Sequence, residues 1–397
     1  MKPFDFVHIA DTHLGYMQYN LPERRADFSR VFVEAVDKTL ELKPSYAILA
    51  GDIFNSPRPP NVTLATAVRE LRRLTDGGVK VFVVDGSHDM APNIMTGTVL
   101  IPLHNARLVT YLPRLEGHSW QDDNCYIYGL QCYRGLQEAD RQLPTYLERG
   151  RPSPKADRFN ILVFHGAVDN PKYMPPYIKP DVREEQLPPG FQYYAAGHIH
   201  HSSVRPFKGG TLVYPGCLET TDYTEATVEK GFFWVRVNSR EEPPDMERVK
   251  VEGAREFKVK EQDFSGQPTE KIVREASRTI SELDSEGAML ALKLKGQLPS
   301  SYRRSQIDIP KIKASAVKAL YPLILNQMVE TSLQETSPLK ETRELKTIAH
   351  SYFLKLLSKK HPPDLSQKLA TVAVELLDCE EARAKTLIEE STRKDSS

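Results

Sequence analysis

Five short runs of mostly apolar residues recur in the first half of the chain, and each stops at polar side chains. The runs are 7–10, 46–50, 81–85, 161–164 and 193–196. A run of four or five such residues is typical of a strand buried on both faces. Residues 27–42 and 62–74, between the first three runs, carry apolar side chains at helical spacing. Strand, helix and strand in this order predict a largely parallel sheet with helical crossovers.

The polar residues at the ends of these runs are of the kinds that bind metals: Asp11, His13, Asp52, His88, His165, His198 and His200. Ligands bind beyond the carboxyl ends of strands in covered sheets, so we expect all seven at one edge of one sheet. Carboxylate and imidazole without thiolate favour Mn²⁺, Fe or Zn²⁺ over Mg²⁺ or Ca²⁺. A carboxylate shared by two ions about 3.5–4 Å apart serves phosphoester hydrolysis. The sequence therefore predicts a dinuclear centre bridged by Asp52.

The pattern changes after residue 200. Residues 211–214 and 231–235 predict short strands in hairpins. A polar stretch near 238–245 predicts a boundary between a first domain, 1–237, and a small α+β capping domain, 246–330. Within the second we expect two strands in 248–260, a helix over 270–283 and a strand over 288–295. After a polar linker, 339–359 and 364–390 predict two helices, and this segment, 339–392, must dock its apolar stripes on something.

Composition limits the class of protein. A chain of 397 residues suggests two or three domains, and 40% hydrophobic with 27% charged residues is typical of a soluble globular protein. The 53 basic and 53 acidic residues cancel, so nucleic-acid binding would need a local positive surface. The four cysteines show no metal-ligand pairing and no disulfide framework. Without a signal-like segment or a long apolar run, we expect no membrane association and a cytoplasmic location.

The motifs themselves resemble a known family. Asp11-x-His13, Gly51-Asp52, Gly86-x-His88-Asp89, His165 and Gly197-His198-x-His200 are similar to the five motifs of the calcineurin-like metallophosphoesterases. The strings HIADTHLGY (8–16), GDIF (51–54) and AGHIH (196–200) resemble the nuclease subunit of the double-strand-break repair complex, called meiotic recombination eleven or, in bacteria, SbcD. The resemblance implies an α/β metallophosphoesterase sandwich of βαβ units, a capping, DNA-binding domain and a C-terminal helix pair.

The resemblance also implies the chemistry. Two Mn²⁺ per chain would be held, one by Asp11, His13, Asp52 and His200, the other by Asp52, residue 87, His165 and His198. His88, oriented by Asp89, would protonate the leaving sugar oxygen or stabilise charge on the phosphate. The implied activity is manganese-dependent hydrolysis of DNA phosphodiesters, as a 3′→5′ exonuclease and single-strand endonuclease. Implied partners are double- and single-stranded DNA ends, a second copy of the chain and an SMC-like ATPase held by the helix pair, at the nucleoid or in a nucleus.

Two residues depart from the family pattern. The family has Gly-Asn-His-Asp where this chain has Gly86-Ser87-His88-Asp89, and the Asn amide oxygen normally ligates the second metal. The shorter Ser87 hydroxyl either fails to reach, which would weaken or abolish activity, or completes the site through a water. Asn55 replaces a His that follows Gly-Asp-x-Phe in the nuclease branch, which affects a phosphate contact and not the metals.

Contacts with DNA and with a second copy of the chain are also predicted. The residues expected to meet DNA are Tyr16, Arg24, Arg25, Asn55, Arg58 and Lys172, with a solvated surface role as the alternative for each basic one. The family's dimer interface corresponds to 62–74 and 94–103, so Leu64, Val68 and Leu100 are the predicted dimer contacts, with core packing as the alternative.

Three functions are compatible with these observations. The first is the DNA repair nuclease. The second is another hydrolase of the same fold, such as a protein phosphatase or cyclic-nucleotide phosphodiesterase. The third is a scaffold that binds DNA and the ATPase while Ser87 leaves its metal site inactive.

Overall fold

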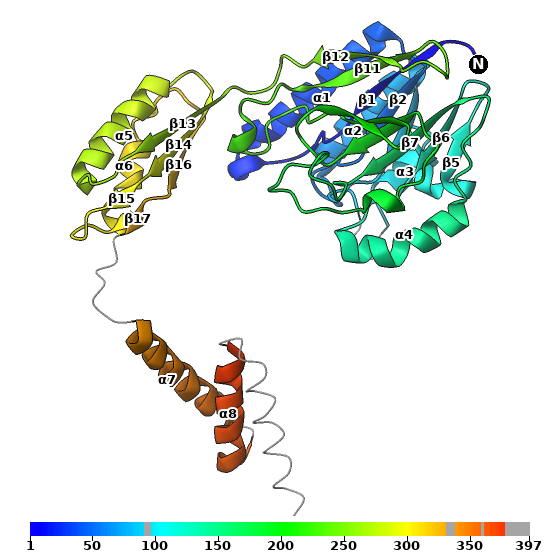
Figure 1. The fold of residues 1–397 in the computed structure, drawn as a ribbon. Helices are drawn as coiled ribbons and strands as arrows, with labels where there is room; N and C mark the ends of the chain where they lie inside the picture. The colour runs from blue at the N-terminus through cyan, green and yellow to red at the C-terminus, as the bar shows by residue number, and fades with distance from the viewer. Residues whose placement is uncertain (91–96, 331–337, 359–360, 378–397) are drawn as a thin grey trace, which may run out of the picture. The chain divides into compact units, whose positions relative to one another are not determined.

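The structure is a computed structural model that describes residues 1–90, 97–330, 338–358 and 361–377 (Figure 1). The chain divides into two compact units. One comprises 1–263, 270–295 and 308–327, and the other comprises 264–269, 296–307 and the chain from 328. No helix in the described ranges is long and apolar enough to cross a membrane.

The first sheet contains the strands that precede Asp11, Asp52 and His88. Its order is β12-β11-β1-β2-β3-β4, with β1 to β4 parallel and β11 and β12 antiparallel. The strand bounds are β1 Phe4–Ile9, β2 Tyr46–Ala50, β3 Lys80–Val84, β4 Thr110–Tyr111, β11 Gly231–Val237 and β12 Asp245–Lys250. Helices α1 (Pro22–Leu42), α2 (Asn61–Asp76) and α3 (Leu100–Asn105) join these strands. The predicted crossovers over 27–42 and 62–74 are therefore confirmed.

A second sheet contains the strands that precede His165 and His198. Its order is β5-β6-β7-β8-β10-β9. The bounds are β5 Ser119–Gln121, β6 Cys125–Gly129, β7 Phe159–His165, β8 Tyr193–Gly197, β9 Ser203–Phe207 and β10 Gly210–Tyr214, with α4 at Leu136–Gly150. The prediction that all the ligands lie at one edge of one sheet is wrong, because the five strands are shared between two sheets.

Apolar side chains hold the two sheets face to face. Phe6, Ile48 and Phe82 of the first sheet belong to one buried cluster with Ile161 and Tyr193 of the second. Each sheet packs its outer face on a further cluster, which involves α1 and α2 for the first and α4 for the second. These strands have apolar side chains on both faces because both faces are covered. The packing brings the ends of β1, β2, β3, β7 and β8 together.

The chain beyond residue 237 differs from the predicted boundary. β12 pairs with β11, so the first sheet extends to Lys250. The hairpins predicted at 211–214 and 231–235 are confirmed as β9–β10 and β11–β12. Next come β13 (Phe257–Asp263), β14 (Met289–Lys295) and β16 (Tyr321–Asn326), a parallel three-stranded sheet, with α5 (Thr269–Leu283) and α6 (Ile309–Lys313).

The other unit contains a two-stranded ladder and two helices. β15 (Gln297–Leu298) pairs with β17 (Val329–Glu330), and α7 (Pro338–Leu357) and α8 (Pro363–Leu377) follow. The two predicted C-terminal helices are therefore present, and residues 378–392 of the predicted segment lie outside the described residues. Single 3₁₀ turns occur at Gln18–Asn20, Leu112–Arg114, Glu116–His118, Glu184–Gln186, Tyr223–Glu225 and Arg304–Gln306.

Candidate metal centre

The loops after the strands are held in an unusual backbone conformation. Asp11, His13, Asp52 and His198 have φ values of 52°, 43°, 49° and 92°, in the left-handed region that non-glycine residues rarely adopt. The loops fix one another, since Asp11 N donates to Gly51 O at 3.1 Å and His13 N donates to Asp52 O at 3.0 Å. Such strain is concentrated at functional sites, where the surroundings over-determine it.

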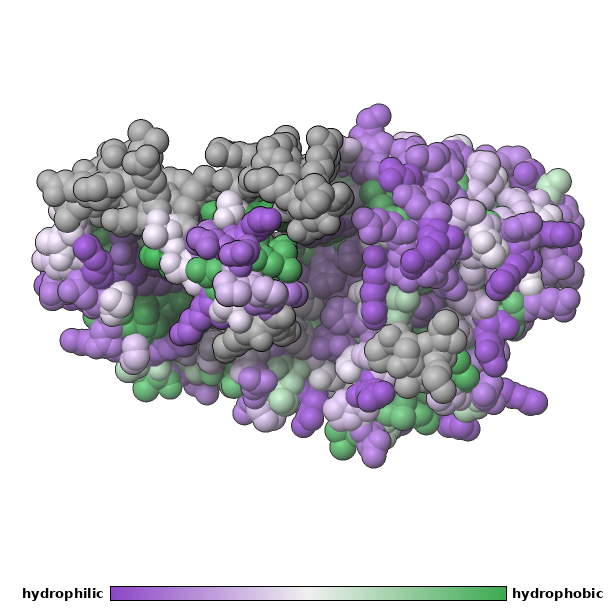
Figure 2. Space-filling model, turned by 90° about the horizontal axis from the view of Figure 1, so that it is seen from below, coloured by the Kyte–Doolittle hydropathy of each residue, from purple (hydrophilic) through white to green (hydrophobic). Residues whose placement is uncertain are grey.

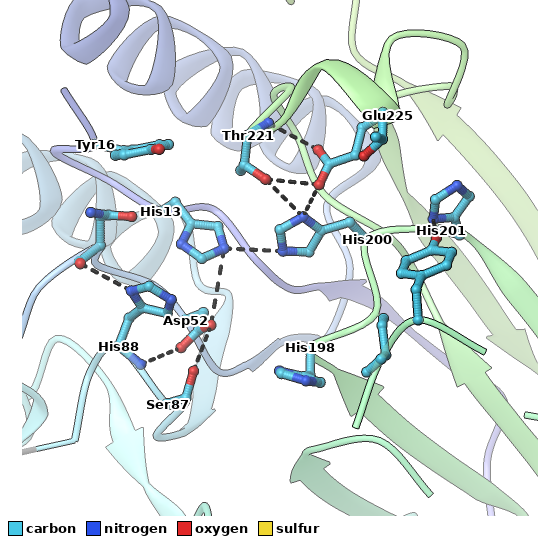
Figure 3. A pocket seen from close by; sticks show the side chains of 14 residues that line it. His13, Tyr16, Asp52, Ser87, His88, His198, His200, His201, Thr221 and Glu225 are labelled. Carbon is cyan, nitrogen blue, oxygen red and sulfur yellow. Dashed lines mark hydrogen bonds and ion pairs between the residues drawn. The ribbon is translucent and has the colours of Figure 1, made fainter. Parts of the chain in front are cut away.

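Asp52 lies at the centre of the site (Figure 3). Its Oδ2 is 3.2 Å from His165 Nε2 and 4.0 Å from His13 Nε2, and its Oδ1 accepts a hydrogen bond from His88 N at 2.8 Å. It is the carboxylate that reaches side chains of both sheets, as expected of a bridging ligand.

Asp11 and His200 belong to the candidate ligand group that also contains His13. The Asp11 carboxylate accepts from His198 N at 3.0 Å, and its Oδ1 lies 3.9 Å from His200 Nε2. His13 Nε2 and His200 Nε2 face each other at 3.2 Å. Ligand atoms within 4.8 Å of one another form the groups Asp11–His13–His200 and Asp52–His165–His198. The structure thus brings together the two ligand sets implied by the resemblance, with Asp52 between them.

The imidazoles are arranged as metal ligands are. His165 Nδ1 donates to Ala50 O at 2.9 Å, which turns the buried Nε2 toward Asp52 Oδ2 at 3.2 Å. His13 turns its Nε2 toward Asp52 Oδ2 at 4.0 Å and His200 Nε2 at 3.2 Å. Imidazole nitrogens gathered in this way around buried carboxylates would be satisfied by a coordinated cation. The donor set therefore fits two divalent ions.

Without metal, the buried acidic and imidazole groups have pKa values far from their usual ones. Burial raises the pKa of Asp11 to about 6. For His165 burial opposes the charged form, but the neighbouring Asp52 carboxylate raises its pKa to about 10. Burial would raise the pKa of Asp52, but the charge and hydrogen bond of His165 lower it well below its usual range. Metal binding to such a centre displaces protons.

Ser87 and His88 lie at the rim of this centre. Ser87 Oγ donates to Asp52 Oδ2 at 3.4 Å, and His88 Nδ1 donates to Asn55 O at 3.1 Å. The expectation that Asp89 orients His88 is wrong. Both carboxylate oxygens of Asp89 are occupied by backbone N–H groups of Ile53, Phe54 and Gly86, so Asp89 shapes the loops around Asp52 instead.

Sequence patterns did not predict several residues that lie around the ligands. Glu225 Oε1 lies 2.6 Å from His200 Nδ1, and Asp181 Oδ2 lies 3.4 Å from His198 Nε2. Both carboxylates come from loops without a motif. Tyr177 OH lies 3.3 Å from His201 Nδ1, and the side chains of both residues line the cavity over the metal centre.

The predicted DNA contacts divide into three groups. Tyr16 and Asn55 line the cavity over the metal centre, which has a volume of 430 Å³. Arg58 and Lys172 are exposed and Arg25 is half-buried, and none of the three lines this cavity. Arg24 is 0% exposed, so its prediction as a DNA contact is wrong.

Arg24 is instead the centre of a buried ion-pair cluster. Its guanidinium pairs with Asp27 at 2.6 Å and Glu219 at 3.2 Å, and Arg255 also binds Asp27. Burial among these partners excludes Arg24 from any contact with DNA phosphates.

The predicted dimer residues also differ in position. Leu100 is 0% exposed and belongs to the core, so its prediction as a dimer contact is wrong. Leu64 and Val68 are half-buried on α2 and stay predictions, while residues 94–96 lie outside the described residues.

Comparison with known proteins agrees with this geometry. Residues 4–202, about half of the chain, match the family model of calcineurin-like phosphoesterases. The chain belongs to this family. It is 31% identical to the DNA double-strand break repair protein Mre11 of Methanocaldococcus jannaschii over 281 residues, 68% of this chain and 73% of that protein. It is 28% identical to Mre11 of Archaeoglobus fulgidus over 366 residues, 86% of this chain and 80% of that protein. Within the phosphoesterases, the chain is a member of the Mre11 family.

Proposed function

We propose that this chain is a metal-dependent DNA nuclease of double-strand-break repair. The single observation that carries the proposal is the pair of ligand groups, Asp11–His13–His200 and Asp52–His165–His198, with Asp52 within 4.0 Å of imidazoles from both. Two ions so held would polarise a phosphodiester and lower the pKa of the attacking water. The relatives' names supply the substrate, since they are DNA double-strand break repair proteins.

His88 is the proposed acid of the reaction. It is exposed at the rim of the cavity, and its Nδ1–H is held by Asn55 O, which leaves Nε2 free to exchange a proton with the leaving oxygen. The buried imidazoles His13 and His165 are unsuited to this task, because they face the metal positions.

The finer expectations belong to the same proposal. We propose Mn²⁺ as the metal, two ions per chain, 3′→5′ exonuclease and single-strand endonuclease activity, and a homodimer that contacts through Leu64 and Val68. The segment from 339 would bind an SMC-like ATPase, the chain from 251 to 330, after β12, would be the capping domain, and the protein would act at the nucleoid or in a nucleus.

A second candidate is favoured by Ser87. Ser87 has a hydroxyl in place of the amide of Asn, so it has no amide oxygen for the second metal position. Its Oγ lies 3.4 Å from Asp52 Oδ2 and donates toward it. A chain whose second position is weak would bind DNA and its partner ATPase without cutting.

The test is Mn²⁺-dependent degradation of end-labelled duplex DNA by the chain, Ser87→Asn and His88→Ala. Cutting by the chain and its loss in His88→Ala would support the nuclease. Cutting by Ser87→Asn alone would support the inactive scaffold. Hydrolysis of a generic phosphodiester with no action on DNA by any variant would contradict both and favour another phosphoesterase.

A further inference from the structure

A second cavity, of 820 Å³, lies beside the metal centre along α4. One polar stripe of α4 lines it: Glu138, Arg141, Gln142, Thr145 and Arg149. This spacing places all five on the same face of the helix. Thr98 and Ile101 line it from another part of the chain, and Asp85 and Tyr111 from the end of the first sheet. In Figure 1 α4 lies at the lower edge of its domain, and Figure 2, seen from below, shows a mostly hydrophilic face there.

The cavity is rich in unpaired positive charge. Its cationic residues are Arg114, Arg134, Arg141 and Arg149. Arg114, Arg141 and Arg149 are exposed and form no ion pair with any residue that the structure describes. The acidic residues are already engaged: Asp85 accepts from Tyr111 OH at 2.8 Å, and Glu138 accepts from Arg134 N at 2.7 Å. In a chain of zero net charge, such a concentration favours binding of an anion.

The cavity lies next to the metal centre. Arg134 Nη2 donates to Ser87 O at 3.3 Å. A smaller cavity of 290 Å³ lies there, and it shares Cys132 and Arg134 with the α4 cavity and His198 with the cavity over the metals. The three cavities therefore follow one another from the metal centre to α4.

Aromatic rings also line the cavity, but they are already packed. His118 and Tyr146 stack on each other at 4.0 Å between centroids with 14° between planes, and Tyr146 and Tyr111 are 8% and 7% exposed. The cavity therefore offers its arginines to the phosphates of a nucleic acid rather than rings to its bases. A helix of 15 residues is about 22 Å long, which spans several phosphates. The cavity volume of 820 Å³ is enough for a short stretch of one strand.

We propose that the α4 cavity binds the phosphates of a single DNA strand that leads to the metal centre. The proposal rests on the nuclease function above, and it names a binding track for the substrate strand. Arg141 and Arg149 are the binding residues, and Arg134 connects the track with Ser87.

The test measures binding of fluorescein-labelled dT12 to the full chain by anisotropy, in EDTA and over a series of salt concentrations. Arg141→Ala/Arg149→Ala should bind at least tenfold more weakly. Each lost phosphate contact on a single strand lowers the slope of log K against log salt by about 0.7, so this variant should lower it by about 1.4. Arg141→Lys/Arg149→Lys should recover much of the slope, because the charge is kept.

The matched control is Arg72→Ala/Arg205→Ala, which removes the same charge from two exposed positions outside the cavity. It should change dT12 binding by roughly twofold at most, as expected of net charge alone. Equal effects of the two pairs, or no effect of the cavity pair, would overturn the proposal. So would an equal loss of affinity for a 12-base-pair blunt duplex, since the proposal assigns the cavity to a single strand.

Hydrolysis of bis-p-nitrophenyl phosphate with Mn²⁺ separates this proposal from the nuclease function. The small diester does not need the α4 track, so the cavity pair should hydrolyse it at the rate of the unchanged chain. A loss of this rate in the cavity pair would mean damage to the metal centre and would overturn the separate role of the cavity. If the unchanged chain and Ser87→Asn both fail to hydrolyse it, the nuclease proposal fails, while the dT12 measurements still decide for or against the track.

Discussion

Glu225 fixes the far side of the imidazole of His200. Its Oε1 lies 2.6 Å from His200 Nδ1, and its Oε2 accepts from Thr221 N at 2.9 Å and lies 3.7 Å from Lys230 Nζ. Nδ1 is thereby kept as the protonated nitrogen, and Nε2 presents its lone pair to the side where Asp11 and His13 lie. A carboxylate behind a ligating histidine both orients the ring and raises its basicity.

Glu225→Gln should therefore weaken metal binding. The loss of a carboxylate behind a ligand typically costs about 10–100-fold in metal affinity. Titration calorimetry with Mn²⁺ on the metal-free chain would measure it. Glu229→Gln, an exposed change four residues away, is the control and should leave the affinity unchanged. Equal affinities for the two variants would show that Glu225 does not support His200.

Ser87→Asn should strengthen the second metal position. The longer side chain carries an amide oxygen toward the space beside Asp52 Oδ2 and His165 Nε2, which lie 3.2 Å apart. A gain of about tenfold or more in the weaker of two Mn²⁺ affinities is expected, since even supporting residues contribute this much. Ser87→Ala is the comparison: if it matches the unchanged chain, the hydroxyl contributes nothing. If Ser87→Asn binds no more tightly, a water or Ser87 itself already completes the site.

Arg24→Ala should destabilise the fold. It leaves Asp27 and Glu219 buried without their partner, and breaking a buried ion pair from one side costs about 3–5 kcal/mol. Urea denaturation followed by circular dichroism would measure the free energy of unfolding. Arg25→Ala, next in sequence and half-buried, should change it by only about 0.5 kcal/mol. An Arg24 variant of normal stability but lower DNA affinity would contradict the structural role.

Leu64→Asp should convert a dimer to a monomer without unfolding the chain, because Leu64 is only partly buried on α2. Size-exclusion chromatography with light scattering would measure the mass. Leu100→Ala is the informative contrast. It removes a fully buried side chain, so it should lower the free energy of unfolding by about 2–5 kcal/mol and leave the oligomeric state unchanged. A dimer that survives Leu64→Asp would exclude this face of α2 as its interface.

Much of the fold and of the metal centre follows from local patterns. A strand buried on both faces is mostly apolar, so apolar runs in the sequence mark β1, β2, β3, β7 and β8. The polar residues at the ends of these runs are therefore recognisable as candidate ligands. Their grouping within each sheet was predictable, because carboxyl ends of parallel strands meet, and the packing of the two sheets then brings both groups together at Asp52.

What the sequence could not determine depends on packing between distant segments. Buried strands look the same whether they belong to one sheet or two, and only the face-to-face packing of Phe82 and Ile161 decides for two. A charged residue such as Arg24 is hydrophilic in any pattern, and only its partner Glu219, far along the chain, makes it a buried residue.

The sequence by itself determined which residues form the candidate metal centre, because strand periodicity is a property of a few neighbouring positions. The tertiary structure alone decided what supports those residues and what surrounds them: Glu225 behind His200, backbone N–H groups around Asp89, and unpaired arginines in the α4 cavity. The physical reason is that a polar side chain acquires its role from the charge and burial of its neighbours, and these come from segments that only folding brings together.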